Sequence, residues 1–379
     1  MIRATLTKKL GLALGVPLAL AVAAELGLRL AGFEYPPVQY AQLILWNPAQ
    51  DAALAGADDL HARDARTLWA PRPGGKVYWS QSNERVNVEG YRGPLRPAEH
   101  PAGALRVVTL GDSSTFGLGV EYADTYSAQL ESELEARGRA AEVLDFGVIG
   151  FTVLQGVERY RERARHFHAD VVVAAFGAVN EHWPVEDSND ADKLAWQHAQ
   201  STGWYRFWKH VRKQLRIAHY VAYLQLKADG GMRARHERYV RPKEAQAEIA
   251  DRAGEVDWEG RRRVDVAEYL EGLDALRRAV EADGARLALV AMPRRPGVEH
   301  ERPILLEYTR ATRDYAAEHG LALCDAHRAF RAAEETLAPD ELFLGSGEEA
   351  DHWHPTPYGH RLIASCLADA LLAQDGAAR

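Results

Sequence analysis

Two short segments, far apart in the chain, contain the residue types that could carry out nucleophilic acyl transfer. Gly111, Asp112 and Ser113 directly follow a strand expected over residues 105–110. A serine on a tight strand-to-helix turn presents its hydroxyl at the carboxyl edge of a sheet, and small neighbours let a substrate approach. Taken alone, the segment could also be a plain turn or a helix cap formed by Asp112.

The second segment ends in His354 and precedes a helix expected from about residue 357. Asp351 stands three residues before His354, so its carboxylate can hold Nδ1 of the imidazole and leave Nε2 free to accept a serine proton. We expect His352 to take no part. A metal site of Asp351, His352 and His354, or a set of surface histidines, is the alternative. Because no further group with ligand spacing follows a strand, we expect no metal.

Two further strand ends carry residues that could stabilise an oxyanion. Gly147 follows a strand expected over 143–146, and Asn180 follows one over 170–176. Ligand sites of parallel sheets lie beyond the carboxyl ends of the strands, so the N–H of Gly147 and the amide of Asn180 could join the N–H of Ser113 there. Each alone could be a turn glycine or a loop amide. Their joint placement at strand ends favours catalysis.

Elements that would position these residues alternate from about residue 104 onward. Short apolar runs predict strands buried on both faces of a parallel sheet, and the stretches between them predict helices. The expected strands are 105–110, 143–146, 170–176, 286–292 and 321–324, and the expected helices are 124–137, 152–166, 264–283, 303–319 and 357–373. This alternation predicts a doubly wound α/β sheet with right-handed crossovers.

Composition excludes several protein classes. Hydrophobic residues make up 47% and charged residues 26% of the 379 residues, which excludes a disordered, collagen-like or multi-pass membrane protein. The net charge of −8 carries no nucleic-acid signature. Two cysteines, Cys324 and Cys366, exclude a disulfide framework and Cys-based zinc or iron–sulfur sites. One bridge between them is possible, but we expect two small buried apolar side chains.

The N-terminus predicts a membrane anchor. Basic residues precede an apolar stretch over 10–30, which is interrupted only by Glu25 and Arg29. At ~1.5 Å per residue the stretch reaches about the 30 Å of a bilayer's hydrocarbon core. Glu25 and Arg29 can pair as i,i+4 neighbours. We expect a signal anchor over residues 1–36, with the bulk of the chain outside the cytoplasm. A cleaved signal peptide is the alternative.

The remaining chain predicts three parts. Residues 37–100 are expected to form an irregular segment packed on the core, with residues 87–93 as a turn leading into it. Residues 101–379 are expected to form the main domain, interrupted by a helical insertion over 185–262. The aromatic and basic stretch 201–217 within this insertion could cover the cleft, rest on a membrane surface, or simply pack on the core.

Four blocks together resemble the SGNH, or GDSL, hydrolase superfamily over residues 104–375. They are Gly-Asp-Ser at 111–113, Asp-Phe-Gly-Val-Ile-Gly at 145–150, Asn-Glu at 180–181 and Asp-x-x-His-Pro at 351–355. Position 145 is Asp where that family often has Asn. The resemblance implies a three-layer α/β/α, flavodoxin-like, doubly wound parallel sheet and no cofactor.

The same resemblance implies roles for the residues singled out above. Ser113 would be the nucleophile, His354 its base and Asp351 the orienting acid, while Ser113, Gly147 and Asn180 would form the oxyanion hole. The resemblance gives these roles only to the motif positions of this sequence. His182 and Trp183, which could line or cover the cleft, are expected separately to contact substrate.

The implied activity is that of a serine ester hydrolase of the lipase, esterase or carbohydrate O-deacetylase type. It would act through an acyl-enzyme on a small-molecule, glycan or lipid ester, outside the cytoplasmic membrane and on the periplasmic side. An O-acyltransferase that uses the same serine on envelope glycans is the main alternative. A non-catalytic envelope protein is a third. Nucleic acid is not expected as a partner.

Overall fold

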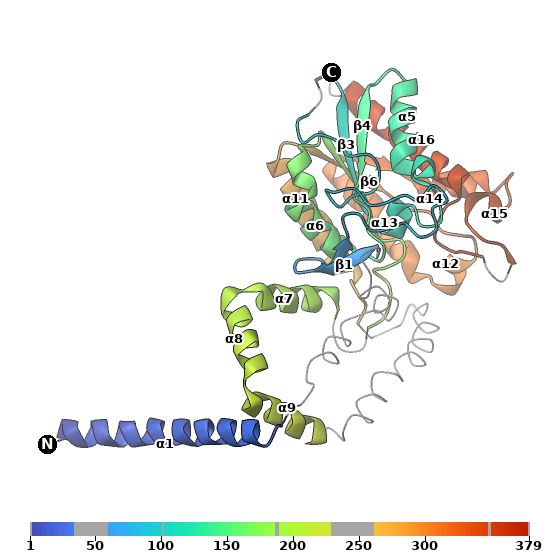
Figure 1. Cartoon of the computed structure of the whole chain (residues 1–379). Coiled ribbons are helices and arrows are strands. Elements are labelled where there is room, and N and C mark those ends of the chain that lie inside the picture. The colour runs from blue at the N-terminus through green and yellow to red at the C-terminus, as the bar shows by residue number, and fades with distance from the viewer. Residues whose placement is uncertain are drawn as a thin grey trace. The chain divides into compact units, whose positions relative to one another are not determined.

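The computed structural model describes residues 2–33, 60–100, 102–185, 189–228, 261–347 and 350–377. The chain divides into two compact units (Figure 1). We call the first, residues 1–51 with 198–247, the helical unit, and the second, residues 52–197 with 248–379, the sheet unit. The sheet unit contains every residue expected to act in catalysis.

Five parallel strands form the centre of the sheet unit. They are β3 (Leu105–Gly111), β4 (Ala141–Asp145), β5 (Val171–Ala175), β6 (Arg286–Val290) and β7 (Ala322–Cys324). Their spatial order is β4-β3-β5-β6-β7, all in parallel register. Counted along the chain, this is the 2-1-3-4-5 order of flavodoxin-like doubly wound sheets. The predicted fold class and all five predicted strands are confirmed.

Helices cover both faces of this sheet. One face carries α6 (Val153–Glu162), α11 (Val266–Ala282) and α13 (Ile304–His319), and the other carries α5 (Tyr126–Ala136), α14 (Ala326–Ala333) and α16 (Pro357–Ala377). Side chains of β3 alternate between the two cores, because successive residues of a strand point to opposite faces. Val108 and Leu110 pack in the first core, and Leu105 and Val107 in the second. The predicted three layers follow (Figure 1).

Shorter elements complete the sheet unit. They are the hairpin β1 (His61–Asp64) and β2 (Leu68–Pro71), the helices α4 (Ser113–Phe116), α12 (Val298–Glu301) and α15 (Pro339–Leu342), and the 3-10 turns η2 (Tyr122–Asp124) and η3 (Ala164–Phe167). Helix α7 spans Asp190–Ser201. The hairpin lies in the segment expected to be irregular. Its Trp69 Nε1 donates to the carbonyl of Ile149 at 2.9 Å, so the hairpin contacts the core. Residues 37–59 of the expected segment lie outside the described ranges.

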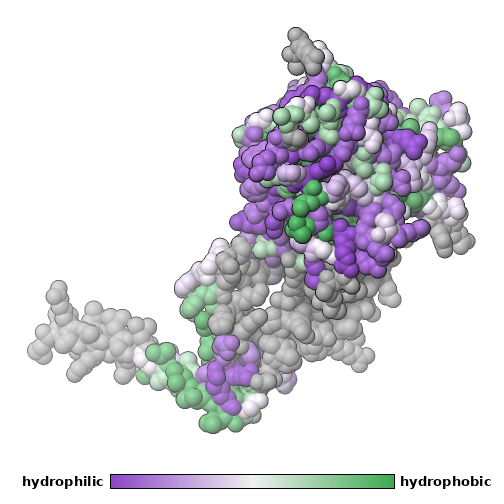
Figure 2. All heavy atoms as spheres, turned by 45° about the horizontal axis from the view of Figure 1, so that its top comes forward, coloured by the Kyte–Doolittle hydropathy of each residue, from purple (hydrophilic) through white to green (hydrophobic). Residues whose placement is uncertain are grey.

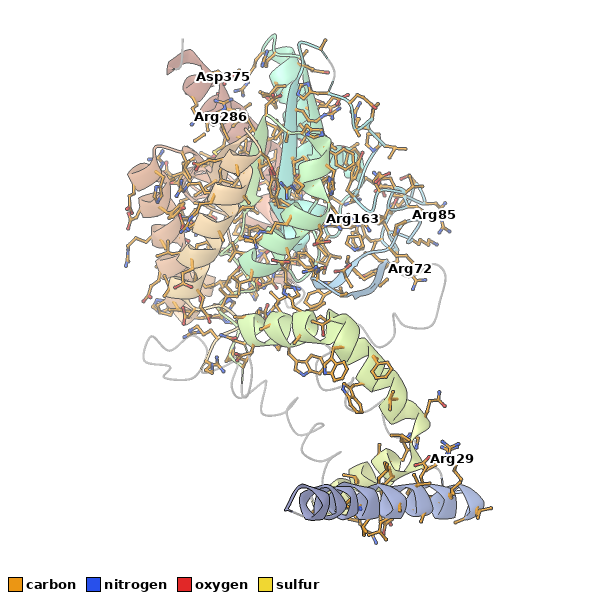
Figure 3. The ribbon with its side chains drawn as sticks, turned by 90° about the vertical axis from the view of Figure 1, so that its left-hand side faces the viewer. Arg29, Arg72, Arg85, Arg163, Arg286 and Asp375 are labelled. Atoms are coloured by element: carbon orange, nitrogen blue, oxygen red, sulfur yellow. A yellow bond between two sulfur atoms is a disulfide. The ribbon has the colours of Figure 1, made fainter. Side chains whose placement is uncertain are left out.

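Helix α16 is held against the sheet at two places. Near its end, Asp375 pairs with Arg286 at the start of β6, at 2.7 Å (Figure 3). Earlier in the helix, Cys366 forms a disulfide with Cys324, the last residue of β7, with 5.3 Å between their Cα atoms. We expected two separate apolar cysteines, and this expectation is wrong, because the packing of α16 on β7 brings the two side chains together.

In its described part, the helical unit contains α1 (Ile2–Leu30), the end of α7 from His198, α8 (Gly203–Gln214) and α9 (Arg216–Ala228). The predicted pair forms, with Arg29 Nε 2.7 Å from Glu25 Oε1 (Figure 3 labels Arg29). Glu25 also accepts the N–H groups of Arg216 and Ile217 at 3.0 and 2.9 Å, so a carboxylate caps the start of α9. The expected insertion is helical over 203–228, and its residues 229–260 lie outside the described ranges.

Leu18, Leu20 and Leu30 on α1 are exposed by 67%, 65% and 90%, and Figure 2 shows green, hydrophobic spheres on the helical unit. Trp204, Phe207 and Trp208 on α8 are exposed by 68%, 56% and 44%. Across the described ranges, no helix combines the length and the apolar character that a membrane span requires. The anchor over residues 1–36 and its cleaved alternative stay predictions.

Candidate active site

Ser113 begins the short helix α4 at the carboxyl end of β3. Asp112 caps this helix, because its Oδ1 accepts the N–H of Ser114 at 2.9 Å. Gly117, at φ 77°, ends it and donates its N–H to the carbonyl of Ser113. The N–H of Ser113 is the first of the helix and has no acceptor among the described residues. The segment is therefore a capped turn. It also leaves the backbone N–H of Ser113 without an acceptor at the carboxyl edge of the sheet.

Ser113, His354 and Asp351 are joined by continuous hydrogen bonds. His354 Nε2 lies 2.8 Å from Ser113 Oγ, and His354 Nδ1 lies 2.6 Å from Asp351 Oδ2. The second carboxylate oxygen of Asp351 accepts the N–H groups of Trp353 and His354 at 2.7 and 2.9 Å. Burial acts to raise the pKa of Asp351, but the hydrogen bonds from His354 and the backbone outweigh it and lower that pKa. The carboxylate is thus held ionised against the imidazole.

The loop that carries His354 is held by backbone and arginine contacts. Leu344 donates its N–H to the carbonyl of His354 at 2.9 Å, and its own carbonyl accepts the N–H of Asp351 at 2.8 Å. The guanidinium of Arg295 donates to the carbonyls of Asp351 and Gly345, both at 2.8 Å. These contacts orient the histidine before any substrate arrives. The sequence did not single out Arg295, since its partners come from a distant loop.

His352 takes no part in the hydrogen bonds of Ser113. Its side chain is exposed, and its carbonyl accepts the N–H of Arg295 at 2.8 Å. Within the ranges that the structure describes, no three His, Cys, Asp or Glu side chains are grouped so that they could hold a metal ion.

Asn180 lies where the sequence predicted, beside the turn of Ser113. Its Nδ2 donates to the carbonyl of Phe151 at 3.0 Å and to Asp112 Oδ2 at 3.2 Å. The segments that follow β3, β4 and β5 therefore meet at the side chain of Asn180. Both amide hydrogens are used in this structure, and the bond to Asp112 is the longer one.

Gly147 does not offer the free N–H that the sequence suggested. That N–H donates to Asp145 Oδ1 at 2.9 Å. Gly147 is required for another reason, because a Cβ at this position would overlap the backbone nitrogen of Phe116. Three residues on, the N–H of Gly150 (φ 80°) has no acceptor among the described residues. Gly150 directly precedes Phe151 and is the better candidate donor.

Asp145 is a fully buried acid at the end of β4. Burial raises its pKa to about 7, although the hydrogen bond from Gly147 and the charge of Arg92 oppose the shift. Its Oδ2 has no hydrogen-bond partner. Because the folded pKa lies above the unfolded value, the contribution of the protonated acid to stability is fully present below about pH 3.8. It is lost progressively as the pH rises from there to about 7.

Asp145→Asn should therefore remove part of the pH dependence of stability. At pH 8 we expect the variant to unfold at a higher temperature than the wild type, because the wild-type acid must ionise in a buried site. At pH 5 the gain in melting temperature should be smaller, because the loss of wild-type stability begins near the ordinary pKa of 3.8 and is then only partly complete. Thermal unfolding at both pH values checks this. A variant that is equally stabilised at both would contradict the assignment to Asp145.

His182 and Trp183 lie beside the catalytic loop. Their rings are 4.7 Å apart, and the His182 ring is 5.8 Å from that of Trp353. The guanidinium of Arg302 lies 4.7 Å above the Trp183 ring. His182 is 1% exposed, and burial, followed by the charge of Arg302, lowers its pKa to about 3. His182 therefore packs against the rings of Trp183 and Trp353, which are only partly buried.

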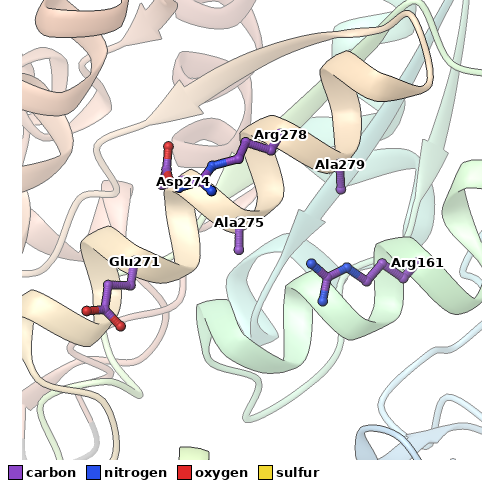
Figure 4. Close-up of a pocket in the computed structure, with 6 residues that line it drawn as sticks. All are labelled: Arg161, Glu271, Asp274, Ala275, Arg278 and Ala279. Carbon is purple, nitrogen blue, oxygen red and sulfur yellow. Dashed lines mark hydrogen bonds and ion pairs between the residues drawn. The ribbon is translucent and has the colours of Figure 1, made fainter.

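A hollow of about 670 Å³ lies elsewhere on the sheet unit (Figure 4). It is lined by Arg161 of α6 and by Glu271, Asp274, Ala275, Arg278 and Ala279 of α11. Arg278 and Asp274 are ion-paired within it. None of these residues touches Ser113 or His354, so the hollow is separate from the candidate site.

A known protein family and several solved structures are similar to this chain. The sequence model of the GDSL-like Lipase/Acylhydrolase family matches residues 109–362, well over half of the chain. The acetylxylan esterase Axe2 from Geobacillus stearothermophilus is 17% identical, with a TM-score of 0.43 and coverage of 71% of this chain and 95% of that one. LAE5, an alpha/beta hydrolase enzyme from the metagenome of Lake Arreo, Spain, is 19% identical, with a TM-score of 0.43 and coverage of 73% and 96%. No curated protein matches the chain. By its family match, the chain belongs to the GDSL-like Lipase/Acylhydrolase family and is an ester-hydrolysing enzyme.

Proposed function

We propose that the protein is a serine ester hydrolase that forms an acyl-enzyme on Ser113. The unbroken hydrogen bonds from Asp351 through His354 to Ser113 Oγ, at 2.6 and 2.8 Å, carry this proposal. Ser113 Oγ attacks the ester carbonyl while His354 Nε2 takes its proton, and the imidazolium then protonates the leaving alcohol. Water, deprotonated by His354, releases the acid.

The oxyanion of the tetrahedral intermediate requires donors that are free in the resting enzyme. The N–H groups of Ser113 and Gly150 meet this requirement, since neither has an acceptor among the described residues. We assign the Asn180 amide as the third donor, which exchanges its longer bond, 3.2 Å to Asp112, for the oxyanion. Preorganised donors of this kind stabilise charge that develops only during reaction.

Asn180→Ala should lower kcat by about 10²–10³-fold, the usual cost of losing one oxyanion donor. KM for p-nitrophenyl acetate should change little, because the ground-state ester carries no such charge. Steady-state kinetics with circular dichroism checks this. Asn189→Ala is the matched control, since Asn189 is similarly buried (4% against 7% exposed) but bonds Glu268 away from the site. Equal kinetic losses in the two variants would remove Asn180 from the oxyanion hole.

The half-buried rings of Trp183 and Trp353 would border the alcohol or acyl part of the ester. A panel of acetylated sugars, short-chain p-nitrophenyl esters and phospholipids, tested on the full-length chain, identifies the ester class. We expect at least one class to be hydrolysed, with turnover lost in His354→Ala. A sugar acceptor added to the reaction separates hydrolysis from transfer. If no ester in the panel reacted, the proposed function would be wrong.

We also propose that the sheet unit works outside the cytoplasm. The disulfide between Cys324 and Cys366 supports this location, because structural disulfides persist mainly in oxidising compartments. Alkylation of free thiols in protein taken directly from its host is the test. Two unmodified cysteines are expected, and two alkylated cysteines would argue for a reducing compartment.

A further inference from the structure

Arg92 lies buried behind the turn that carries Ser113, with 1% of its side chain exposed. All five of its side-chain N–H donors have acceptors. Nη1 donates to the carbonyls of Phe116 and Gly117 at 2.6 and 2.8 Å. Nη2 donates to the carbonyl of Val120 at 2.8 Å and to Glu84 Oε2 at 2.7 Å, and Nε donates to the same carboxylate oxygen at 3.1 Å.

The two carbonyls bound by Nη1 belong to the peptide groups that hold Ser113. The peptide between Phe116 and Gly117 has its carbonyl on Arg92 and its N–H on the carbonyl of Ser113. The next peptide has its carbonyl, that of Gly117, on Arg92, and its N–H, that of Leu118, donates to the same Ser113 carbonyl at 2.9 Å. One guanidinium nitrogen therefore fixes both peptide planes that orient the backbone of Ser113.

The guanidinium itself has little freedom to move. It lies over the rings of Phe116 and Trp79, at 5.2 and 5.7 Å from their centroids. Glu84, which orients it, also accepts the N–H of Tyr122 through its other oxygen at 2.6 Å. Hydrogen bonds in series polarise one another, and buried charge-assisted bonds are the stronger kind. Residues 79–92 thus form a rigid support for the nucleophile's turn.

We propose that Arg92 is a positioning residue for the nucleophile, which sets the backbone of Ser113 so that Oγ meets His354 Nε2. The proposal rests on the proposed function of Ser113. In this role Arg92 makes the segment before the main domain contribute to turnover. Arg92 itself touches neither substrate nor the reacting atoms. Its loss should lower kcat and leave KM unchanged, because ground-state binding of the ester does not use it.

The chain offers a matched control in Arg106. This residue is 0% exposed, pairs with Glu142 at 2.8 Å, and donates to the carbonyls of Ala98, Glu99 and Phe167. Like Arg92, it is buried, forms an ion pair and donates to backbone carbonyls. It lies at the start of β3, whereas Ser113 follows the end of that strand. A purely structural role would make the two arginines equivalent.

The test compares Arg92→Lys with Arg106→Lys in the full-length chain. A fluorophosphonate probe counts reactive Ser113 sites, and kcat per labelled site and KM are measured with p-nitrophenyl acetate. For Arg92→Lys we expect kcat per site to fall about 10²-fold, the effect of a small misplacement of a reacting group, with KM within about threefold. For Arg106→Lys we expect kcat per site to stay within about threefold of wild type, whatever the loss of melting temperature.

Equal kcat per site in the two variants would overturn the proposal. If Arg92→Lys does not fold, Glu84→Gln and Glu142→Gln decide in its place, since the two carboxylates are 18% and 17% exposed. Glu84→Gln should then lower kcat per site about tenfold by weakening the charge-assisted bonds, and Glu142→Gln should not. Equal values again contradict the proposal. A wild-type enzyme that the probe does not label would instead contradict the nucleophilic role of Ser113.

Discussion

Ser113→Ala is expected to reduce kcat for p-nitrophenyl acetate by about 10⁴-fold or more, with the protein still folded. The hydroxyl is the only group within hydrogen-bond reach of His354 Nε2 in the described structure, at 2.8 Å. Without it, His354 can act only on water, and the remaining donors supply a small residual rate. Steady-state kinetics and the loss of fluorophosphonate labelling measure the effect.

Ser127→Ala is the control for this substitution. Ser127 is also a buried serine, 0% exposed, and its Oγ lies 2.8 Å from Thr109 Oγ1, away from His354. We expect this variant to keep kcat within about threefold, since no reacting atom is touched. Wild-type turnover in Ser113→Ala would show that another residue is the nucleophile.

Asp351→Asn should lower kcat by about 10⁴-fold, because it changes the tautomer of His354. The amide oxygen can still accept the N–H groups of Trp353 and His354, so the loop should keep its shape. The amide nitrogen, however, would donate to His354 Nδ1, which now lies 2.6 Å from a carboxylate oxygen. The imidazole proton then moves to Nε2, and the histidine can no longer accept the proton of Ser113.

Asp325→Asn serves as the control for a lost carboxylate. Asp325 caps α14 by accepting the backbone N–H of Arg328, and it pairs with Arg313. Its side chain is 13% exposed. Asparagine is also a good helix cap, so kcat should be unchanged. If Asp351→Asn kept wild-type kcat, Asp351 would not orient the base.

Much of the sheet unit could be predicted because its signals are local. Buried strands such as Val171–Ala175 are continuous apolar runs, and the helices between them repeat their apolar residues at helical spacing. Ser113 and His354 stand in short motifs next to such elements. Helix α14 and the hairpin of β1 and β2 were missed, because eight-residue helices and four-residue strands show too few repeats to establish a period.

What could not be predicted depends on contacts between distant segments. The glycine with the free N–H is Gly150 and not Gly147, and only the side chain of Asp145 makes the difference. Arg92 stood in a turn that the sequence singled out, but its contacts with Phe116 and Gly117 depend on how residues 60–96 fold against the turn after β3. The spacing of Cys324 and Cys366 likewise does not reveal whether their side chains meet.

The most direct measurement is to catch the acyl-enzyme itself. Full-length protein is mixed with p-nitrophenyl acetate, quenched in acid within the first turnovers, digested and analysed by mass spectrometry. We expect one acetyl group on the peptide that contains Ser113, and none in Ser113→Ala or His354→Ala. Acetylation at a different residue, or product release with no acetylated protein at any time, would contradict covalent catalysis at Ser113.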